Sequence, residues 1–478
     1  MSGATWNDHV LTRWRGSDHA AVVTPDTTWS GDELLQRASG AAAWLSERGF
    51  PAGAPVPALL DASPTAIALV TGGAFARRPL APLGTKLPPE QLAVAARACS
   101  EVGIVTTTEL VASAREVARL AGLTLHVLDG PPPPRPIVEP AASPDDLALV
   151  IHTSGTTGAP KRVPVTHRAL VARLAVYRAT MGIGDGDRYV SASPFHHTAG
   201  VTMVFTVLGL GGAVLPQARF SVEGWREAGR LGVTHALLVP TMIDLLLAEG
   251  ALADARPRLL QYGAAPIHVA TLAEALAALP DTRFLQIFGQ TEVSPLTALT
   301  HDDHLLGLRS RPELLTTVGR AVIDTELRVE GPDLDGIGEI AVRAPHAFVV
   351  DDDGWRRTGD LGRIDAEGYV TLHGRVGDRI IRGGENIYPI EVERALVTHP
   401  AVREVAVVGM PDRRWGEVVK AVVVPVDAAA APTLAELQTF ARPHLASFKL
   451  PTVLDVVDEL PRNASGKLLR YALIGAPA

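Results

Sequence analysis

Residues 152–167 hold many groups that can bind phosphate. This segment, "HTSGTTGAPKRVPVTH", contains two glycines, one serine, four threonines and a lysine, and it follows an apolar run. Gly155 and Gly158 have no Cβ, so the backbone can turn tightly and a ligand can approach it closely. The neighbouring hydroxyl and N–H groups and the charge of Lys161 suit phosphate oxygens. The candidate phosphate ligands are Thr153, Ser154, Gly155, Thr156, Thr157, Gly158 and Lys161.

The segment differs from the Walker A loop of P-loop NTPases. That loop needs Gly-Lys followed by Ser or Thr at the start of a helix, whereas here Pro160 precedes the lysine and Arg162 follows it. A solvated turn rich in glycine and threonine is the alternative interpretation. The segment alone leaves both interpretations open, and the other motifs of the chain have to decide between them.

The string "TSGTTGAPK" resembles the phosphate-binding loop of the adenylate-forming (ANL) superfamily, which includes acyl-CoA synthetases, adenylation domains of peptide synthetases and luciferases. Six further segments match motifs of that superfamily in the same order: "PFHHTAG", "YGAAP", "FGQTE", "RRTGDLG", "GRVGDRIIRGGENIYP" and "NASGK". The resemblance covers nearly the whole chain. It indicates the acyl-CoA synthetase or acyl-AMP ligase type.

The resemblance implies a nucleotide site. It places Phe288 against adenine, Thr291 on the α-phosphate and Glu292 on Mg²⁺, and carboxylate oxygen is the ligand that such a hard cation prefers. Asp360 would accept hydrogen bonds from both ribose hydroxyls, which suits a carboxylate. Arg375 would reach the ribose or a phosphate. The remaining expected nucleotide contacts are Gly263, Ala264, Ala265 and Gly289.

Two of these motifs have alternative interpretations when each is taken alone. A Thr-Glu pair after a strand more often caps a helix, and "YGAAP" is typical of a tight turn.

The resemblance also implies an acyl pocket. His197 would gate this pocket or stack on it, and for His196 a hydrogen-bonded core histidine is the alternative. A zinc site is a poor interpretation of the two histidines, because no metal-ligand spacing accompanies them. The expected lining is Phe195, His197, Val201, Tyr262, Gly263 and Gln290. Aromatic and small residues of this kind suit an aryl acid or an apolar acid of medium length.

The last motifs imply a hinge, a thiol tunnel and a catalytic lysine. Lys467 matches the family lysine that bridges the substrate carboxylate and the α-phosphate, although a lysine near a chain end is ordinarily just solvated. The superfamily usually carries a charged hinge residue where this chain has Gly377, followed by Asp378. Glycine absorbs large φ/ψ changes, so rotation remains feasible. Gly383, Gly384 and Glu385 would form a tunnel for a pantetheine arm, and Pro389 would begin a helix.

These assignments predict an AMP-forming acid ligase. The enzyme would convert a carboxylic acid and ATP into acyl-AMP and pyrophosphate and then pass the acyl group to coenzyme A. Its catalytic residues would be Lys467, Glu292, Thr291 and His197, with ATP, Mg²⁺ and coenzyme A as cofactors and co-substrates.

Other acceptors and one other class of protein remain open. The alternative acceptors are an amine, as in an amide bond synthetase, or a carrier-protein phosphopantetheine. Gly377 weakly favours the amine, because direct aminolysis need not require the same domain turn. A regulator that senses ATP without turnover would need neither Lys467 nor Glu292, so these two residues argue against it.

The elements that position these residues predict an α/β fold. Strand-length apolar runs alternate with helical segments such as 33–49 and 269–280, as in parallel sheets with crossover helices. The predicted strands and the loops after them are 147–155, 188–195, 235–240, 258–266 and 283–292. Ligands bind at the carboxyl ends of such strands. The proline-rich residues 129–146 form a surface connector.

The domain organisation is predicted as follows. Residues 1–375 form a large N-terminal domain of two doubly wound α/β subdomains plus a small barrel-like subdomain. Residues 376–478 form a small α+β C-terminal domain on a hinge, in the order strand, helix, strand, strand, helix.

Composition narrows the class of protein. The length of 478 residues exceeds what a single hydrophobic core usually serves, so at least two domains are expected. The net charge is −8 and no basic stripe is present, so nucleic acid is an unlikely partner on electrostatic grounds. Cys99 is the single cysteine, which excludes an internal disulfide and favours the cytoplasm. The N-terminal residues lack a signal-peptide core, and the apolar run 201–216 is short for a bilayer span, so no membrane anchor is expected. The oligomeric state cannot be read from the sequence.

Overall fold

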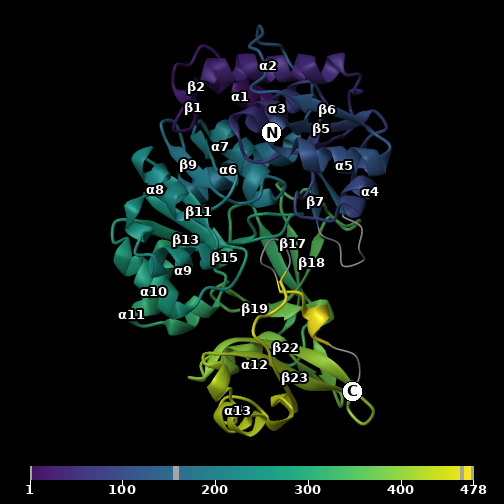
Figure 1. Ribbon diagram of the computed structural model, residues 1–478. Coiled ribbons are helices and arrows are strands. Elements are labelled where there is room, and N and C mark those ends of the chain that lie inside the picture. Colours follow the sequence, from purple (N-terminus) through teal and green to yellow (C-terminus); the bar gives the residue numbers. More distant parts are fainter. Residues whose placement is uncertain (1–2, 154–160, 463–467, 475–478) are drawn as a thin grey trace. The chain divides into compact units, whose positions relative to one another are not determined.

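The computed structural model describes residues 3–153, 161–462 and 468–474. The chain forms two compact units (Figure 1). The first unit comprises residues 1–326 and 343–356, and the second comprises residues 327–342 and 357–478. Each unit is described by itself.

The first unit contains a six-stranded sheet in the order β6-β5-β3-β4-β7-β8. Its strands are β3 (Val56–Leu59), β4 (Leu80–Pro82), β5 (Gly103–Thr107), β6 (Thr124–Leu128), β7 (Leu147–Thr153) and β8 (Lys161–Thr166). All neighbouring strands are parallel except β8, which runs antiparallel to β7. The intervening helices are α3 (Pro64–Phe75), α4 (Pro89–Cys99) and α5 (Val111–Ala121), preceded by α2 (Gly31–Glu47).

A nine-stranded sheet forms the other half of the first unit. Its order is β15-β14-β13-β12-β11-β9-β10-β1-β2, and the six strands from β13 to β1 are parallel. The strands are β1 (Ala20–Val23), β2 (Thr28–Ser30), β9 (Arg188–Ser191), β10 (Ala213–Pro216), β11 (His235–Leu238), β12 (Leu259–Gly263), β13 (Arg283–Phe288), β14 (Thr297–Leu299) and β15 (Arg320–Ala321). The associated helices are α1 (Trp6–Trp14), α6 (His167–Met181), α7 (Met203–Leu210), α8 (Val222–Arg230), α9 (Pro240–Ala248), α10 (Val269–Ala278) and α11 (His301–Arg309).

Small residues let the core helices pack closely. Helix α3 is apolar almost all round and is buried over most of its length, as a helix between a sheet and other helices must be. At Gly72 a Cβ would lie 2.3 Å from the backbone oxygen of Ala38 on α2, so only glycine permits this approach. Trp6 of α1 fills the space beside α7, and its Nε1 donates to the backbone oxygen of Phe205 at 2.7 Å.

The strands and helices predicted in this unit are confirmed. The five predicted strands are β7, β9, β11, β12 and β13, and the two predicted helices are α2 and α10. The proline-rich connector contains neither a helix nor a strand between residues 129 and 146. The apolar run 201–216 is not a span but the buried helix α7 followed by β10. Among the described residues, no helix is both long and apolar enough to cross a bilayer.

The second unit contains two smaller sheets. One has the order β16-β17-β18-β19, with β16 (Glu326–Glu330), β17 (Gly338–Arg343), β18 (Arg356–Ile364) and β19 (Val370–Arg375). The other has the order β21-β20-β23-β22 with β24 beside β23, and comprises β20 (Ile380–Arg382), β21 (Glu385–Ile387), β22 (Val402–Asp412), β23 (Gly416–Pro425) and β24 (Val453–Val456). Helices α12 (Pro389–Leu396) and α13 (Leu434–Ala441) pack on the latter sheet around Val392, Leu396 and Leu437.

The mixed α/β class is therefore confirmed, with two corrections of detail. The predicted first strand after residue 375 is a hairpin of two short strands, and an additional strand, β24, follows α13. The glycine pair explains the hairpin, because it allows the chain to reverse between β20 and β21 within two residues. The domain boundary at residue 375 stays a prediction.

Candidate functional site

The predicted ligand loops of the first unit follow neighbouring parallel strands. Strands β12 and β13 pair with Gly263 opposite Ile287, so the loops after Gly263 and Phe288 start side by side. A Cβ on Gly263 would lie 2.3 Å from the backbone oxygen of Ile287, so the close pairing of the strands requires glycine here. Ala264 follows with a φ of +66°, and it is exposed together with Ala265. This arrangement gathers the predicted adenine-side residues at one sheet edge.

Thr291 and Glu292 lie at the tip of a tight turn after β13. The turn is closed by two backbone hydrogen bonds, from Gln290 N to the oxygen of Val293 and from Leu296 N to the oxygen of Phe288, both 2.8 Å. Gly289 allows this closure, since a Cβ there would lie 2.8 Å from Ser294 Oγ. Both predicted side chains are partly exposed.

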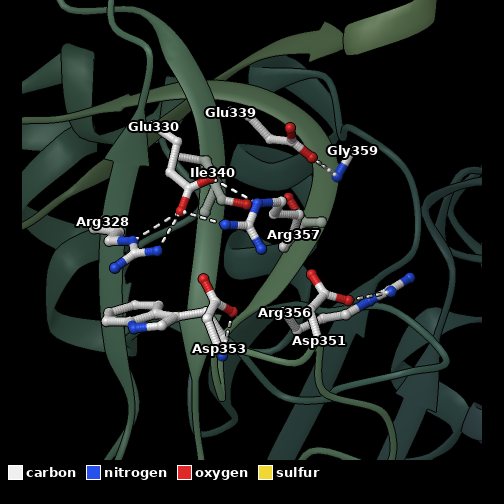
Figure 2. Close-up of polar contacts among 11 residues, drawn as sticks. Arg328, Glu330, Glu339, Ile340, Asp351, Asp353, Arg356, Arg357 and Gly359 are labelled. Atoms are coloured by element: carbon white, nitrogen blue, oxygen red, sulfur yellow. Dashed lines mark hydrogen bonds and ion pairs between the residues drawn. The ribbon is translucent and has the colours of Figure 1, made fainter.

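Glu292 is fixed at its backbone and paired at its carboxylate. Phe348 N donates to the backbone oxygen of Glu292 at 2.7 Å. Arg356 Nη2 lies 3.3 Å from Glu292 Oε1, and Arg356 Nη1 lies 3.2 Å from Asp351 Oδ1. Figure 2 shows the contact of Arg356 with Asp351. Arg356 was not predicted as a site residue, because only the aspartate of the motif "RRTGDLG" was assigned a role.

Arg173 is a second residue that sequence reasoning missed. It lies on α6 and is 1% exposed. Its Nε donates to Thr206 Oγ1 at 3.1 Å, its Nη2 donates to Tyr177 Oη at 3.0 Å, and its Nη1 donates to the backbone oxygen of Ser294. Arg173 thereby connects α6 and α7 to the turn that carries Glu292. The sequence does contain one indication of this role. Arg173 lies among apolar residues on the face of α6 that also carries Leu170 and Tyr177, and a charged residue at a buried position needs specific polar partners.

The charge of Arg173 is buried among neutral groups. None of its hydrogen-bond partners within the described ranges is a carboxylate. Its guanidinium lies over the ring of Tyr177, 4.4 Å from the ring centroid. Burial lowers the pKa of this guanidinium, but arginine stays protonated at neutral pH. A buried cation is costly unless polar groups solvate it, and the carbonyl of Ser294 contributes to that role.

His346 holds the same turn from another side. It is fully buried, and burial lowers its pKa to about 4, so the ring is neutral at pH 7. Its Nε2–H donates to the backbone oxygen of Pro295 at 2.7 Å. Arg173, His346 and Phe348, which are all far from the turn in sequence, thus donate to the backbone oxygens of Ser294, Pro295 and Glu292.

The predicted acyl-pocket residues fall into two groups. His197 precedes a π-helical turn (Thr198–Thr202), where Val201 is buried, and Phe195 before it is 3% exposed. The rings of His196 and His197 lie 4.2 Å apart between centroids. Burial lowers the pKa of both histidines, that of His196 to about 3, so both rings are neutral at pH 7.

Tyr262 lies in the core of the first unit. It is 1% exposed, and its hydroxyl forms a 2.8 Å hydrogen bond with His304 Nε2. Burial raises the pKa of this phenol. Its contact with an acyl group stays a prediction, as does that of Gln290.

The ends of the phosphate-binding segment are adjacent. Thr153 ends β7 and Lys161 begins β8, and the two residues pair directly in the antiparallel ladder. Lys161 is exposed. The predicted ligands Ser154, Gly155, Thr156, Thr157 and Gly158 lie outside the described residues.

The second unit brings together the two predicted ribose ligands. Asp360 on β18 pairs in register with Arg375 on β19, and Arg375 Nε lies 2.8 Å from Asp360 Oδ1. Arg375 Nη1 also donates to the backbone oxygen of Thr358 at 3.0 Å. Asp360 is only 7% exposed, whereas the side chain of Arg375 is 43% exposed.

The predicted hinge and tunnel glycines differ in their steric needs. Gly377 lies in a short 3₁₀ turn (Val376–Asp378), and an added Cβ would meet no atom within 4 Å. Gly383 and Gly384 connect β20 to β21 with φ values of +60° and +92°, which fits a two-residue hairpin. Glu385 is exposed at the start of β21.

Arg470, near the C-terminus, is bound to α12 and to the hinge turn. Lys467 lies outside the described residues. Arg470 Nη1 lies 2.6 Å from Glu393 Oε1 and 2.7 Å from the backbone oxygen of Val407, and Arg470 Nε lies 3.4 Å from Asp378 Oδ2. Pro389 begins α12, as predicted.

Comparison with known families and proteins agrees with this arrangement. The family model described as AMP-binding enzyme matches residues 12–349, and the model described as AMP-binding enzyme C-terminal domain matches residues 391–467. The fatty acid–[acyl-carrier-protein] ligase ScoC of Streptomyces coeruleorubidus is 37% identical over 369 residues, which are 72% of this chain and 69% of that protein. The 2-succinylbenzoate–CoA ligase of Bacillus velezensis is 34% identical over 349 residues, 69% of each protein.

Solved structures resemble the chain over nearly its full length. The amide bond synthetase McbA of Marinactinospora thermotolerans is 27% identical and covers 98% of each chain, with a TM-score of 0.86. The o-succinylbenzoate CoA synthetase of Bacillus subtilis, in complex with its acyl-adenylate intermediate, is also 27% identical, with a TM-score of 0.84 over 100% of this chain and 99% of that one. These structures have the large N-terminal and small C-terminal domains of their superfamily. The chain belongs to the AMP-binding enzyme family of the adenylate-forming superfamily and is an AMP-forming acid ligase.

Proposed function

We propose that this enzyme activates an aryl or medium-length apolar carboxylic acid as its acyl-AMP and transfers the acyl group to coenzyme A. The turn at residues 289–295 supports this proposal most directly. It presents Thr291 and Glu292 at the edge where the parallel strands end, and three distant residues hold it. A turn fixed this firmly, with its polar tip partly exposed, is suited to a charged ligand.

In the first step, a carboxylate oxygen of the acid attacks the α-phosphorus of ATP. A new oxygen–phosphorus bond forms, and the bond to the β-phosphate oxygen breaks, so pyrophosphate leaves with its electron pair. Thr291 and Lys161 would stabilise the charge that develops on the α-phosphate, and Lys467 would bridge it to the acid. Asp360 and Arg375 would hold the ribose.

Glu292 has the chemistry of a Mg²⁺ ligand. Its carboxylate is partly exposed and already accepts a cationic group, the guanidinium of Arg356. Mg²⁺ in nucleotide sites is usually held by one or two carboxylates together with substrate phosphates and water, so the single carboxylate of Glu292 would suffice for a nucleotide-bound ion. When bound, Mg²⁺ would screen the triphosphate against the incoming carboxylate.

The apolar and neutral character of the expected pocket supports the choice of acid. Phe195 and Val201 are buried, and burial keeps His197 neutral. A second anionic group on the acid would find no positive partner among these residues.

Coenzyme A is the preferred acceptor. Gly383 and Gly384 have no side chains, so their turn would leave room for a pantetheine arm, and several relatives are CoA ligases. The second candidate acceptor is an amine, because the amide bond synthetase McbA is among the similar structures and Gly377 departs from the usual charged hinge. A carrier-protein phosphopantetheine is the third, in view of ScoC.

We also assign the enzyme to the cytoplasm. Its single cysteine, Cys99, is free and buried, and burial raises its pKa to about 11. A chain with this cysteine content needs no oxidising compartment.

The experiment is a two-stage assay with purified full-length protein. A panel of aryl and aliphatic acids is screened with ATP and Mg²⁺ for acid-dependent pyrophosphate release. The active acids are then offered coenzyme A or a set of primary amines, and the products are identified by mass spectrometry. Acyl-CoA supports the main proposal and an amide supports the second. Pyrophosphate release that is independent of every acid would contradict both.

A further inference from the structure

Arg356 is positioned by a tight turn that precedes β18. Asp351 N donates to the backbone oxygen of Trp355 at 2.6 Å, and Gly354 N donates to the backbone oxygen of Asp351 at 2.9 Å. The turn places Asp351 and Arg356 beside each other (Figure 2). Arg356 can therefore stay attached to Asp351 while its other contacts change.

The guanidinium of Arg356 is shared between two carboxylates. Its Nη2 lies 3.3 Å from Glu292 Oε1 and its Nη1 lies 3.2 Å from Asp351 Oδ1. The three side chains are 25%, 22% and 30% exposed for Arg356, Glu292 and Asp351, so water can reach them and partners can exchange. Arg356 Nε is buried and has no hydrogen-bond partner in the described part of the chain, so this guanidinium is incompletely satisfied.

The pair with Glu292 conflicts with the metal role of that carboxylate. A carboxylate oxygen that accepts a guanidinium hydrogen cannot at the same time give that lone pair to a metal ion. The backbone of Glu292 is held by Phe348 N, so an exchange of partners involves the side chain only. A divalent ion that binds Glu292 therefore competes with Arg356 for Oε1, and its charge repels the guanidinium.

We propose that Arg356 is a placeholder cation for Glu292. It neutralises the carboxylate of Glu292 until the metal–nucleotide complex binds, and it then releases Glu292 but stays paired with Asp351. This inference rests on the proposed function, because it needs Glu292 to bind the metal. Arg356 is thus a residue that tunes metal affinity at the site. Before the nucleotide binds, Arg356 gives the partly buried carboxylate of Glu292 a positive partner.

The neighbouring Arg357 provides a matched control. It has the same charge and the adjacent position in the chain, but its Nε lies 2.8 Å from a different carboxylate oxygen, Glu330 Oε2. Figure 2 shows this second pair. Removal of either arginine changes the net charge by one unit and removes an ion pair with a carboxylate, but only Arg356 is paired with Glu292.

The experiment measures Mn²⁺ binding to the full chain in the presence of α,β-methylene ATP, whose α–β bond cannot be cleaved. The amplitude of the free Mn²⁺ signal in electron paramagnetic resonance gives the Mn²⁺ concentration at which half of the protein sites are occupied, the half-saturating concentration. Arg356→Met should lower this concentration about three- to fivefold, the range for loss of one partly exposed ion pair. Arg357→Met and Arg356→Lys should stay within about twofold of wild type. Arg356→Gln replaces the methionine variant if thermal melting shows that the latter is unfolded.

The outcomes separate the inference from the proposed function. An unchanged or raised half-saturating concentration in Arg356→Met, or an equal fall in Arg357→Met, overturns the placeholder role and leaves the proposed function intact. Failure of the wild-type protein to bind Mn²⁺ with the nucleotide analogue overturns the metal role of Glu292 and the inference with it.

Discussion

At the scale of single residues, the charged side chains of the candidate site are defined by the partners that they contact. Asp360 and Arg375 were expected at one site, and they form a 2.8 Å ion pair. Arg173 and Arg356 were not expected, because their roles come from contacts with residues more than 60 positions away. Tertiary packing creates such roles, and no local pattern encodes them.

The first prediction concerns Arg173. Arg173→Met removes the donors to Ser294, Thr206 and Tyr177 and leaves buried acceptors unpaired, so the free energy of unfolding should fall by about 1–3 kcal/mol. Displacement of the turn should also slow acid-dependent pyrophosphate release by about 10²-fold in kcat. Urea unfolding and steady-state kinetics measure the two effects.

Arg168→Met on the same helix is the control for Arg173. Arg168 is exposed and pairs with Asp145 at 2.8 Å, so its loss should change the free energy of unfolding by less than about 1 kcal/mol. Equal losses of stability and rate in the two variants would contradict the role given to Arg173.

The second prediction concerns the pH dependence that His346 contributes. Burial lowers the pKa of His346 to about 4, below its unfolded value near 6.5, so the unfolded chain binds more protons between these values. Stability should therefore fall as pH drops from 6.5 to 4. His346→Gln can still donate to the oxygen of Pro295 but cannot titrate. The slope of unfolding free energy against pH near pH 5 should decrease by about 1 kcal/mol per pH unit, and an unchanged slope would contradict the neutral, buried ring.

At the scale of elements, the pattern of apolar residues and the turn residues after it were enough to predict the strands that end at the candidate site. β7, β12 and β13 were located because each is a short apolar run followed by small or polar residues. The hairpin at residues 380–387 was missed, because strands of three residues carry too few side chains for a period to be recognised. The glycines between them were given only a role toward the acceptor, yet their positive φ values show a structural need.

The third prediction compares two glycines of the second unit. Gly383→Ala should destabilise the protein by about 1–2 kcal/mol, because φ is +60° and the new Cβ would lie 2.9 Å from Trp415 Cε3. Gly377→Ala meets no atom within 4 Å and should be neutral or stabilise by about 0.4–1 kcal/mol. Thermal unfolding of the two variants measures the difference. A destabilisation at Gly377 as large as that at Gly383 would show that the hinge turn requires glycine.

At the scale of the whole molecule, the fold class and the family followed from the order of motifs along the chain. The motif order predicts a domain boundary at residue 375, and this boundary stays a prediction. Contacts within the structure group the four-stranded sheet that holds Asp360 with the C-terminal residues. Sequence motifs record chemistry, while compactness depends on contacts summed over many apolar residues, so the two need not coincide.

The central claim, that the acid is activated as acyl-AMP, is tested most directly by isotope transfer. An accepted acid labelled with ¹⁸O in its carboxylate is incubated with ATP, Mg²⁺ and an acceptor, and the products are analysed by mass spectrometry. Attack of the carboxylate on the α-phosphorus predicts one ¹⁸O atom in AMP and none in pyrophosphate. Unlabelled AMP, or label in inorganic phosphate with ADP as the nucleotide product, would contradict the account.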